Sequence, residues 1–211
     1  MKNDQPARGR GRPRAFDRDE ALAAAAETFW RLGYEGASIV DLTTAMGITP
    51  QSLYAAFGSK AELYRESLDW YRSIIPLPQE VLDKPGVLAT LGDRLIELAH
   101  FFADPIHPPG CMISATMLFA ATENQPVAES LANGRRANLR RIQTRLERAQ
   151  AEGELSPEAD PAALARFVGA IVQGMAVQAR DGANQADLAG LARLAAEQLS
   201  RYSAKSRRKG R

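Results

Sequence analysis

Hydroxyl, amide and phenol side chains stand close together in the segment TPQSLYAAFGSK, residues 49–60. In a helix, its outward residues would be Thr49, Gln51, Ser52 and Tyr54, with Lys60 just beyond its end. Amides pair with adenine edges in the major groove of DNA, and hydroxyls bond to bases or phosphates. The chemistry indicated is DNA recognition, and the alternative is a plain helical hairpin with a polar face.

The residues around this segment predict a compact set of short helices. Ser38 opens one helix, a tight turn follows at Gly47, and Thr49 opens the next helix. Ser59 opens a third. Two short helices joined by a tight turn have helix-turn-helix proportions. A longer helix is expected before them from Asp17 to about Gly33, and the side chains expected to lock the unit together are Phe29, Ile39, Leu42, Ile48, Leu53 and Phe57.

Residues 16–71 resemble the DNA-binding domain of TetR/AcrR-type transcriptional regulators. The resemblance rests on a run A..F...GY.G.S over residues 26–38 and a run GIT..SLY..F.SK.EL over residues 47–63. One departure stands at Ala55 and Ala56, where the family often has an aromatic residue or histidine. Fewer phosphate contacts are therefore expected from this helix. The roles that the resemblance implies are phosphate contact for Ser38, base reading for Thr49, Gln51 and Ser52, and backbone anchoring for Tyr54 and Lys60.

Arginines alternate in the stretch RGRGRPR that precedes the first predicted helix. Arg10, Arg12 and Arg14 surround a Gly-Arg-Pro core similar to an AT-hook, and such arginines can lie along a narrow minor groove. We expect an arm that orders on DNA and offsets the contacts missing at Ala55 and Ala56; a solvated tail is the alternative. Residues 1–14 carry net charge +4 and residues 203–211 carry +5, so that the chain's total of +2 leaves −7 for residues 15–202.

The rest of the chain predicts longer helices after a proline-punctuated break at residues 74–86. Apolar periodicity places them at about 86–103, 111–121, 126–152, 160–180 and 185–201. The fold class is therefore all-α, a small helix-turn-helix module on a larger helical bundle. The expected divisions are a basic arm (1–15), a DNA-binding domain (16–72), a helical ligand-binding and dimerisation domain (73–202) and a basic tail (203–211).

The resemblance implies that the second half binds an inducer and forms a homodimer on a palindromic operator of double-stranded DNA. Helical bundles commonly hold ligands between their helices. The candidates for an inducer pocket are Phe101, Phe102, Cys111, Met112, Met117, Phe167 and Met175. The candidates for a dimer interface are Phe167, Ile171, Leu188, Leu191, Ala195 and Leu199. An intramolecular hairpin of the last two helices is the alternative to the dimer.

Cys111 is the single cysteine, and it stands at or near the start of a predicted helix. Helix N-terminal N–H groups favour a thiolate there, and some relatives with a similar Gly-Cys respond to oxidants or electrophiles. A small buried apolar residue is the alternative. His100 and His107 could join Cys111 around a metal, but the spacing matches no common ligand pattern, so neither a metal nor a cofactor is predicted.

The sequence is compatible with three functions. The favoured one is a dimeric, ligand-responsive transcriptional repressor, and activation instead of repression is the alternative. A cysteine-based enzyme would need a base and an oxyanion site beside Cys111, which the pattern does not indicate, so no enzyme is predicted. An architectural DNA binder built on the basic ends would not distinguish sequences. With one cysteine, no signal-peptide pattern and no long apolar window, a cytoplasmic location without a membrane partner is expected.

Overall fold

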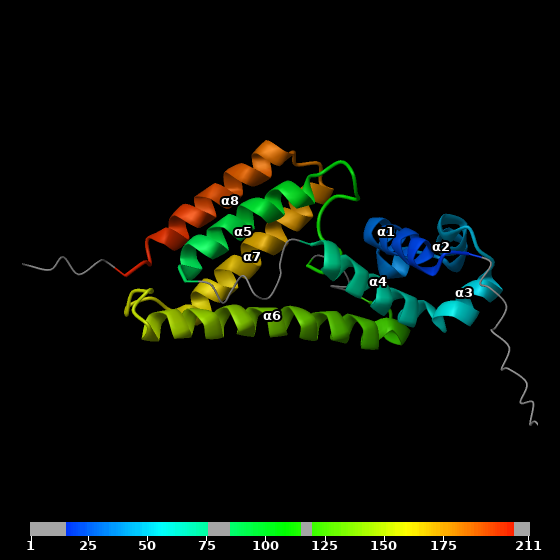
Figure 1. The fold of residues 1–211 in the computed structure, drawn as a ribbon, viewed down its shortest axis with the longest axis horizontal. Coiled ribbons are helices and arrows are strands. Elements are labelled where there is room, and N and C mark those ends of the chain that lie inside the picture. Colours follow the sequence, from blue (N-terminus) through cyan, green and yellow to red (C-terminus); the bar gives the residue numbers. More distant parts are fainter. Residues whose placement is uncertain (1–15, 76–84, 115–119, 205–211) are drawn as a thin grey trace, which may run out of the picture.

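The structure, a computed structural model, describes residues 16–75, 85–114 and 120–204. These residues form an all-α fold, which confirms the predicted class (Figure 1). In chain order the elements are α1 (Arg18–Gly36), α2 (Ile39–Met46), α3 (Pro50–Phe57), α4 (Lys60–Ile74), α5 (Val87–Phe102), the 3-10 turn η2 (Thr122–Asn124), α6 (Gln125–Ala151), α7 (Pro161–Arg180) and α8 (Gln185–Ser200).

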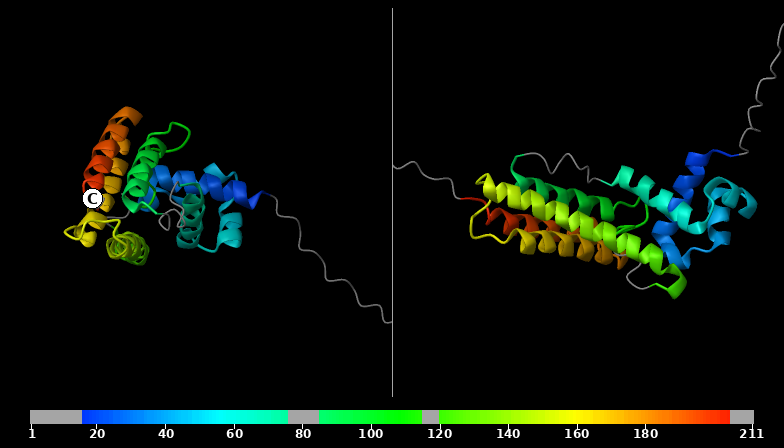
Figure 2. Two further views of the ribbon diagram at one scale, coloured as in Figure 1. Left: turned by 60° about the vertical axis from the view of Figure 1, so that its left-hand side comes forward. Right: turned by 90° about the horizontal axis from the view of Figure 1, so that it is seen from below.

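The helices divide the molecule along its length. Helices α1 to α3 gather at one end, α5, α7 and α8 pack together at the other, and α4 lies between them (Figure 1). The views in Figure 2 show α6 running alongside α5 and α7, with its first turns near α1 and α4. We call α1 to α3 the first group of helices and α5, α7 and α8 the second group. The long helix α6 therefore reaches from the second group back to the first.

Side-chain caps explain why the N-terminal helices begin where they do. Asp17 accepts hydrogen bonds from the amides of the first turn of α1, and Ser59 accepts one from Glu62 N at 3.1 Å. Each such cap stabilises a helix by about 1 kcal/mol. The expected stop of the first helix at Gly33 is instead a kink, because Gly33 has φ 74° and the helix continues for one more turn to Gly36.

Most predicted helix boundaries in the second half agree with the structure within one residue, but the segment after Cys111 differs. Residues 111–114 form turns rather than the start of a helix, and the next described element is η2. The two prolines and the glycine before Cys111 explain this, because the chain folds back there and Gly110 N donates to Phe102 O at 2.9 Å. Cys111 therefore stands in a turn and not at a helix N-terminus.

Glu154 ties the far end of the second group together. Its Oε2 accepts hydrogen bonds from Gly86 N at 3.1 Å and Val87 N at 3.3 Å, and lies 3.3 Å from the nearly buried Arg145. Burial alone would raise the pKa of Glu154, but the two amides and Arg145 together lower it. This carboxylate substitutes for the missing side-chain cap of α5.

The second group also contains an unusually apolar helix, α7. By length and composition, α7 is the one helix among the described residues that could cross a membrane, yet only 33% of its apolar window is buried in the chain. It packs against α5, α6 and α8 as part of the bundle. Its apolar side chains thus extend beyond what this chain covers.

Candidate nucleic-acid interface

Helices α2 and α3 form a helix-turn-helix of two eight-residue helices. The turn passes through Gly47, which adopts the left-handed conformation (φ 64°, ψ 30°) that favours glycine. Ile48 N donates to Thr43 O at 3.1 Å and closes the turn. The buried side chains of Leu53 and Phe57 then fix the inner face of α3 against the other helices.

The outer face of α3 carries the side chains that the sequence indicated for base reading. Thr49 and Gln51 are exposed, and Tyr54 is 48% exposed. Ser52 is partly covered, and its Oγ lies 3.0 Å from Thr49 Oγ1, the oxygen that also caps the helix. The structure therefore places Thr49 at the start of α3 and leaves Gln51 and Tyr54 exposed on that helix, with Ser52 partly covered between them.

Ser38 lies at the start of α2 with its hydroxyl already engaged. Its Oγ donates to Asp41 Oδ2 at 2.6 Å and accepts from Asp41 N at 3.0 Å. The Ser38 hydroxyl and the Ser38 backbone N–H both donate to Asp41 Oδ2 and lower the pKa of Asp41, so a carboxylate stands beside the expected phosphate contact. Val40, which no motif in the sequence marks, is 70% exposed close to Ser38 and leaves an apolar side chain on the surface of α2.

Two basic residues near α3 pack inward. Lys60 Nζ lies 4.6 Å from the centre of the Tyr34 ring. Partial burial lowers the pKa of Lys60, and nearby Glu35 partly offsets this effect. Arg18, missed in the sequence, lies over the Phe57 ring at 4.4 Å and pairs with both carboxylate oxygens of Glu66 at 2.7 Å. Arg18 therefore acts as a brace for α3, and Lys60 is held over the Tyr34 ring.

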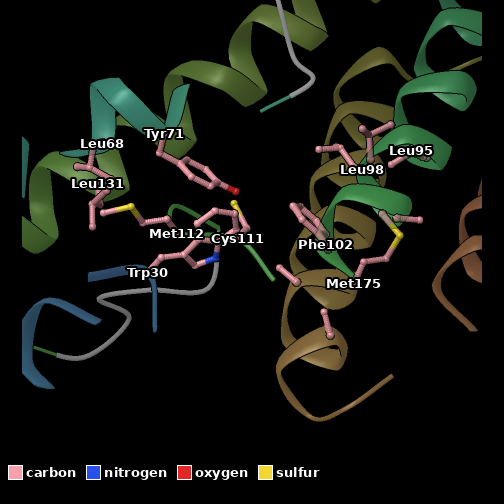
Figure 3. Close-up of a cluster of buried hydrophobic side chains, with 14 of the residues drawn as sticks. Trp30, Leu68, Tyr71, Leu95, Leu98, Phe102, Cys111, Met112, Leu131 and Met175 are labelled. Carbon is pink, nitrogen blue, oxygen red and sulfur yellow. The ribbon is translucent and has the colours of Figure 1, made fainter. Parts of the chain in front are cut away.

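An aromatic cluster joins the helix-turn-helix unit to the second group of helices. The Trp30 indole stacks on His107 at 4.6 Å between ring centres and meets Tyr71 edge-on at 4.7 Å. Figure 3 shows Trp30, Tyr71, Cys111 and Met112 together beside α1 and α4. Arg180, from α7, donates to Trp30 O at 2.6 Å. A movement of α7 can thus be transmitted to α1 directly, through the contact of Arg180 with Trp30.

Glu35 forms a second connection, which we call the Glu35 latch. Its Oε1 accepts from Ala121 N at 2.9 Å, and its Oε2 accepts from Asn124 Nδ2 at 2.8 Å. Both bonds lower the pKa of Glu35, and the bond from the Ala121 amide has the larger effect. Because Asn124 directly precedes α6, the latch joins the end of α1 to the start of that helix. No pattern in the sequence pairs residues so far apart.

A cavity of about 330 Å³ lies between α4, α5, α6 and α7. Cys111 is part of its wall, as the sequence suggested. The thiol is buried, and its Sγ accepts from Ile113 N at 3.4 Å and Ser114 N at 3.3 Å. The pKa of Tyr71 is raised mainly by burial of its hydroxyl and, to a smaller extent, by the neighbouring Cys111.

The other predicted pocket residues lie elsewhere. Phe102, Met112 and Met175 are fully buried in the core, and Figure 3 shows Phe102 and Met175 on the α5–α7 side, apart from Met112. Phe101 packs in the aromatic cluster, and Phe167 is only partly buried. None of these five is among the described residues that line this cavity. Met117 lies outside the described residues, as do Arg10, Arg12 and Arg14.

The two histidines make contacts of other kinds. His100 Nδ1 lies 2.6 Å from Gln185 Nε2, and His107 Nδ1 lies 3.1 Å from Pro108 O. Within the part of the chain that the structure describes, no group of three or more His, Cys, Asp or Glu residues could hold a metal ion.

The residues expected at a dimer interface divide into two sets. Leu188, Ala195 and Leu199 are buried within the chain. Phe167, Ile171 and Leu191 are only partly buried, and two further apolar side chains on the same helices are exposed, Val177 at 44% and Leu194 at 65%. The fully buried set therefore holds α8 in its own bundle, and only the partly buried and exposed side chains are accessible on the surface of α7 and α8.

Comparison with known proteins matches both parts of the chain. Residues 21–66 match the family described as bacterial regulatory proteins, tetR family, and residues 89–194 match the family described as tetracyclin repressor-like, C-terminal domain. The chain is 34% identical over 180 residues to the HTH-type transcriptional repressor ComR of Escherichia coli, covering 84% of this chain and 86% of that protein. It is 38% identical over 105 residues to the repressor BdcR of the same organism, covering 49% of this chain and 53% of that protein.

Solved structures agree with this similarity. A triple cysteine mutant of the TetR family regulator CifR, complexed with 26-base-pair operator DNA, is 38% identical and superimposes with a TM-score of 0.83. That match covers 89% of this chain and 98% of that one. A TetR regulator from Rhodococcus sp. RHA1 is 37% identical with a TM-score of 0.57, covering 87% of this chain and 98% of that one.

Proposed function

Because the chain belongs to the TetR family of bacterial transcriptional regulators, we propose that it represses transcription by binding an operator through α2 and α3. The observation that carries the proposal is the outer face of α3, where Thr49, Gln51 and Tyr54 are exposed together on a helix fixed from behind. The solved CifR relative is bound to operator DNA, which supports the same role here. In this role the protein is a regulator and not an enzyme, and it acts on DNA in the cytoplasm.

The repressor acts as a homodimer on a palindromic operator. A single helix-turn-helix reads only a few base pairs, so dimers commonly bind two half-sites one helical turn apart. The partly covered apolar surface on α7 and α8, with Phe167, Ile171 and Leu191, provides the contact between copies. This arrangement also explains why α7 is more apolar than its burial within one chain requires.

A small molecule in the cavity releases the repressor. The cavity is walled by α6, whose start is joined to α1 by the Glu35 latch, and by α4, which carries Tyr71 of the aromatic cluster. A ligand that favours one arrangement of these helices therefore changes the separation of the two reading helices in the dimer. A tenfold change in operator affinity needs only about 1.4 kcal/mol of coupling.

Modification of Cys111 gives a second route to release. The buried thiol lines the cavity and neighbours Tyr71 of the aromatic cluster, so an oxygen or alkyl group added to the sulfur would either occupy the cavity or displace that cluster. An oxidant or electrophile small enough to enter the cavity would reach the sulfur there. The two routes share one wall of the same cavity.

The basic ends add affinity that does not depend on sequence. Arg10, Arg12 and Arg14 would extend from the start of α1 into a minor groove, and the tail at residues 203–211 is a weaker candidate for the same role. Such contacts release counterions and steepen the salt dependence of binding.

Selection of binding sites from random duplex DNA with the purified full-length chain tests the proposal. We expect an enriched inverted repeat, bound by two chains, with at least a thousandfold preference over random DNA of the kind typical for specific regulators. Equal affinity for random and selected DNA would contradict the proposal and favour an architectural binder.

A further inference from the structure

The cavity of the second group carries charges of one sign only. Its described charged lining residues are Arg72 from α4, Arg94 from α5, and Arg135 and Arg141 from α6. No aspartate or glutamate is among the described residues that line it. The acidic partners of Arg72 and Arg94 are Asp69 and Glu97, which lie outside the lining. The described lining therefore offers guanidinium groups to an anion and no carboxylate to a cation.

Two of these arginines are held in the wall rather than in solvent. The side chain of Arg94 is 22% exposed, and its Nε is buried with no hydrogen-bond partner among the described residues. Arg135 is partly buried and donates from Nη1 to Ile113 O at 3.1 Å, on the turn that holds Cys111. Burial lowers the pKa of Arg135, so its environment disfavours the charge that a bound anion would favour. A buried donor without a partner is costly, and a ligand acceptor would remove that cost.

The remaining lining is mostly apolar. Most of the apolar part comes from α5, α6 and α7, through Leu91, Leu95, Leu98, Leu131, Ile142 and Val168 among others. A volume of about 330 Å³ lies at the small end of the range of about 300–1,000 Å³ common for small-molecule sites. The cavity thus fits a small body with an apolar surface and one anionic group.

We infer that the effector of this cavity is an organic carboxylate, with an apolar chain or ring against the leucines and its carboxylate on Arg94 and Arg135. The inference rests on the proposed function, in which this cavity holds the ligand that controls DNA binding. Guanidinium groups bind carboxylates through paired, charge-assisted hydrogen bonds, which single out this class among small amphipathic molecules. A carboxylate on Arg135 would also pull on α6, the helix whose start carries the Glu35 latch.

Calorimetry on the full-length chain tests the ligand class. The probes are hexanoate, octanoate, decanoate, dodecanoate and naphthoate, each compared with the alcohol and the alkyl- or arylammonium ion of the same skeleton. We expect at least one carboxylate to bind at least about tenfold more tightly than its alcohol, with no binding of its ammonium ion. Alcohols or ammonium ions that bind as tightly as every carboxylate would overturn the inference.

Substitutions locate the carboxylate. Arg94→Gln and Arg135→Gln should each lower the affinity for the preferred carboxylate about tenfold or more, and leave the affinity for its alcohol unchanged. Arg140→Gln is the matched control, because Arg140 is exposed on α6 and is not a lining residue. Retention of the carboxylate preference in both lining variants would refute the assignment.

Operator binding, measured on the same samples, separates this inference from the proposed function. A carboxylate that binds through Arg94 and Arg135 without weakening operator binding would uphold the ligand class and contradict release through this cavity. Normal operator binding with no carboxylate preference would do the reverse, refuting the ligand class while leaving DNA recognition standing.

Discussion

Gln51→Ala tests the reading role of α3 at one side chain. Gln51 is exposed near the start of that helix, and the described contacts give its amide no partner within the protein. The amide is therefore available to pair with an adenine edge. Its loss should not unfold the protein, because alanine is the better helix former at an exposed position by a few tenths of a kcal/mol.

The magnitude follows from two copies of the contact in a dimer. One amide–base contact is worth about 1–3 kcal/mol, so two would cost about 2–6 kcal/mol, or at least about 30-fold in operator affinity. Binding to random DNA should change little, since phosphate contacts carry that affinity. The assay is fluorescence anisotropy with the selected operator and with random duplex at one salt concentration.

Gln143→Ala is the matched control for this experiment. Gln143 lies on α6 and makes an intrahelical bond to Glu147 at 2.8 Å, far along the chain from the helix-turn-helix. It should leave both affinities unchanged. Undiminished operator affinity in Gln51→Ala, or an equal loss on random DNA, would refute the assignment of base reading to Gln51.

Four further results are expected. Glu35→Ala should speed hydrogen exchange at the amide of Ala121, which loses its acceptor, whereas Glu27→Ala on the exposed side of α1 should not; equal exchange rates would remove the Glu35 latch from the account. Cys111→Ser should abolish oxidant-induced release from the operator, and release as in the unmodified chain would exclude a thiol route. The pKa of Glu154 is lower in the folded chain than in the unfolded chain, so its ionised carboxylate stabilises the fold. This stabilisation of the fold is fully present above the unfolded pKa of about 4.3 and is lost as pH falls through the folded pKa. The melting temperatures of the natural chain and of Glu154→Gln should thus differ at neutral pH and converge in acid, and a gap that persists in acid would count against this sign. Removal of residues 1–14 should flatten the salt dependence of operator binding, and an unchanged slope would make the arginine run a solvated tail.

The sequence predicted the local structure well where short-range chemistry decides it. Caps such as Ser38 and Thr49, together with apolar spacing, correctly predicted the helix-turn-helix, and Gln51 and Tyr54 are exposed on it. It failed at Cys111, where apolar periodicity predicted a helix and the preceding prolines instead produce a turn.

Long-range contacts could not be predicted because they depend on how helices meet. Nothing near Lys60 in the chain indicates that it packs over Tyr34, and nothing near Arg94 and Arg135 indicates that they line one cavity. Of the aromatic residues predicted for the pocket, Phe102 instead fills the core, and Phe101 packs in the aromatic cluster. Residue type alone does not separate a core side chain from a ligand contact, since both are apolar and both are buried.

The most direct test of the central claim is a crystal structure of the full-length chain with its selected operator. The account predicts two chains related by a two-fold axis, with α3 of each in a major groove and Gln51 and Ser52 at base edges. A complex in which α3 lies outside the groove, or in which one chain alone binds the site, would contradict it.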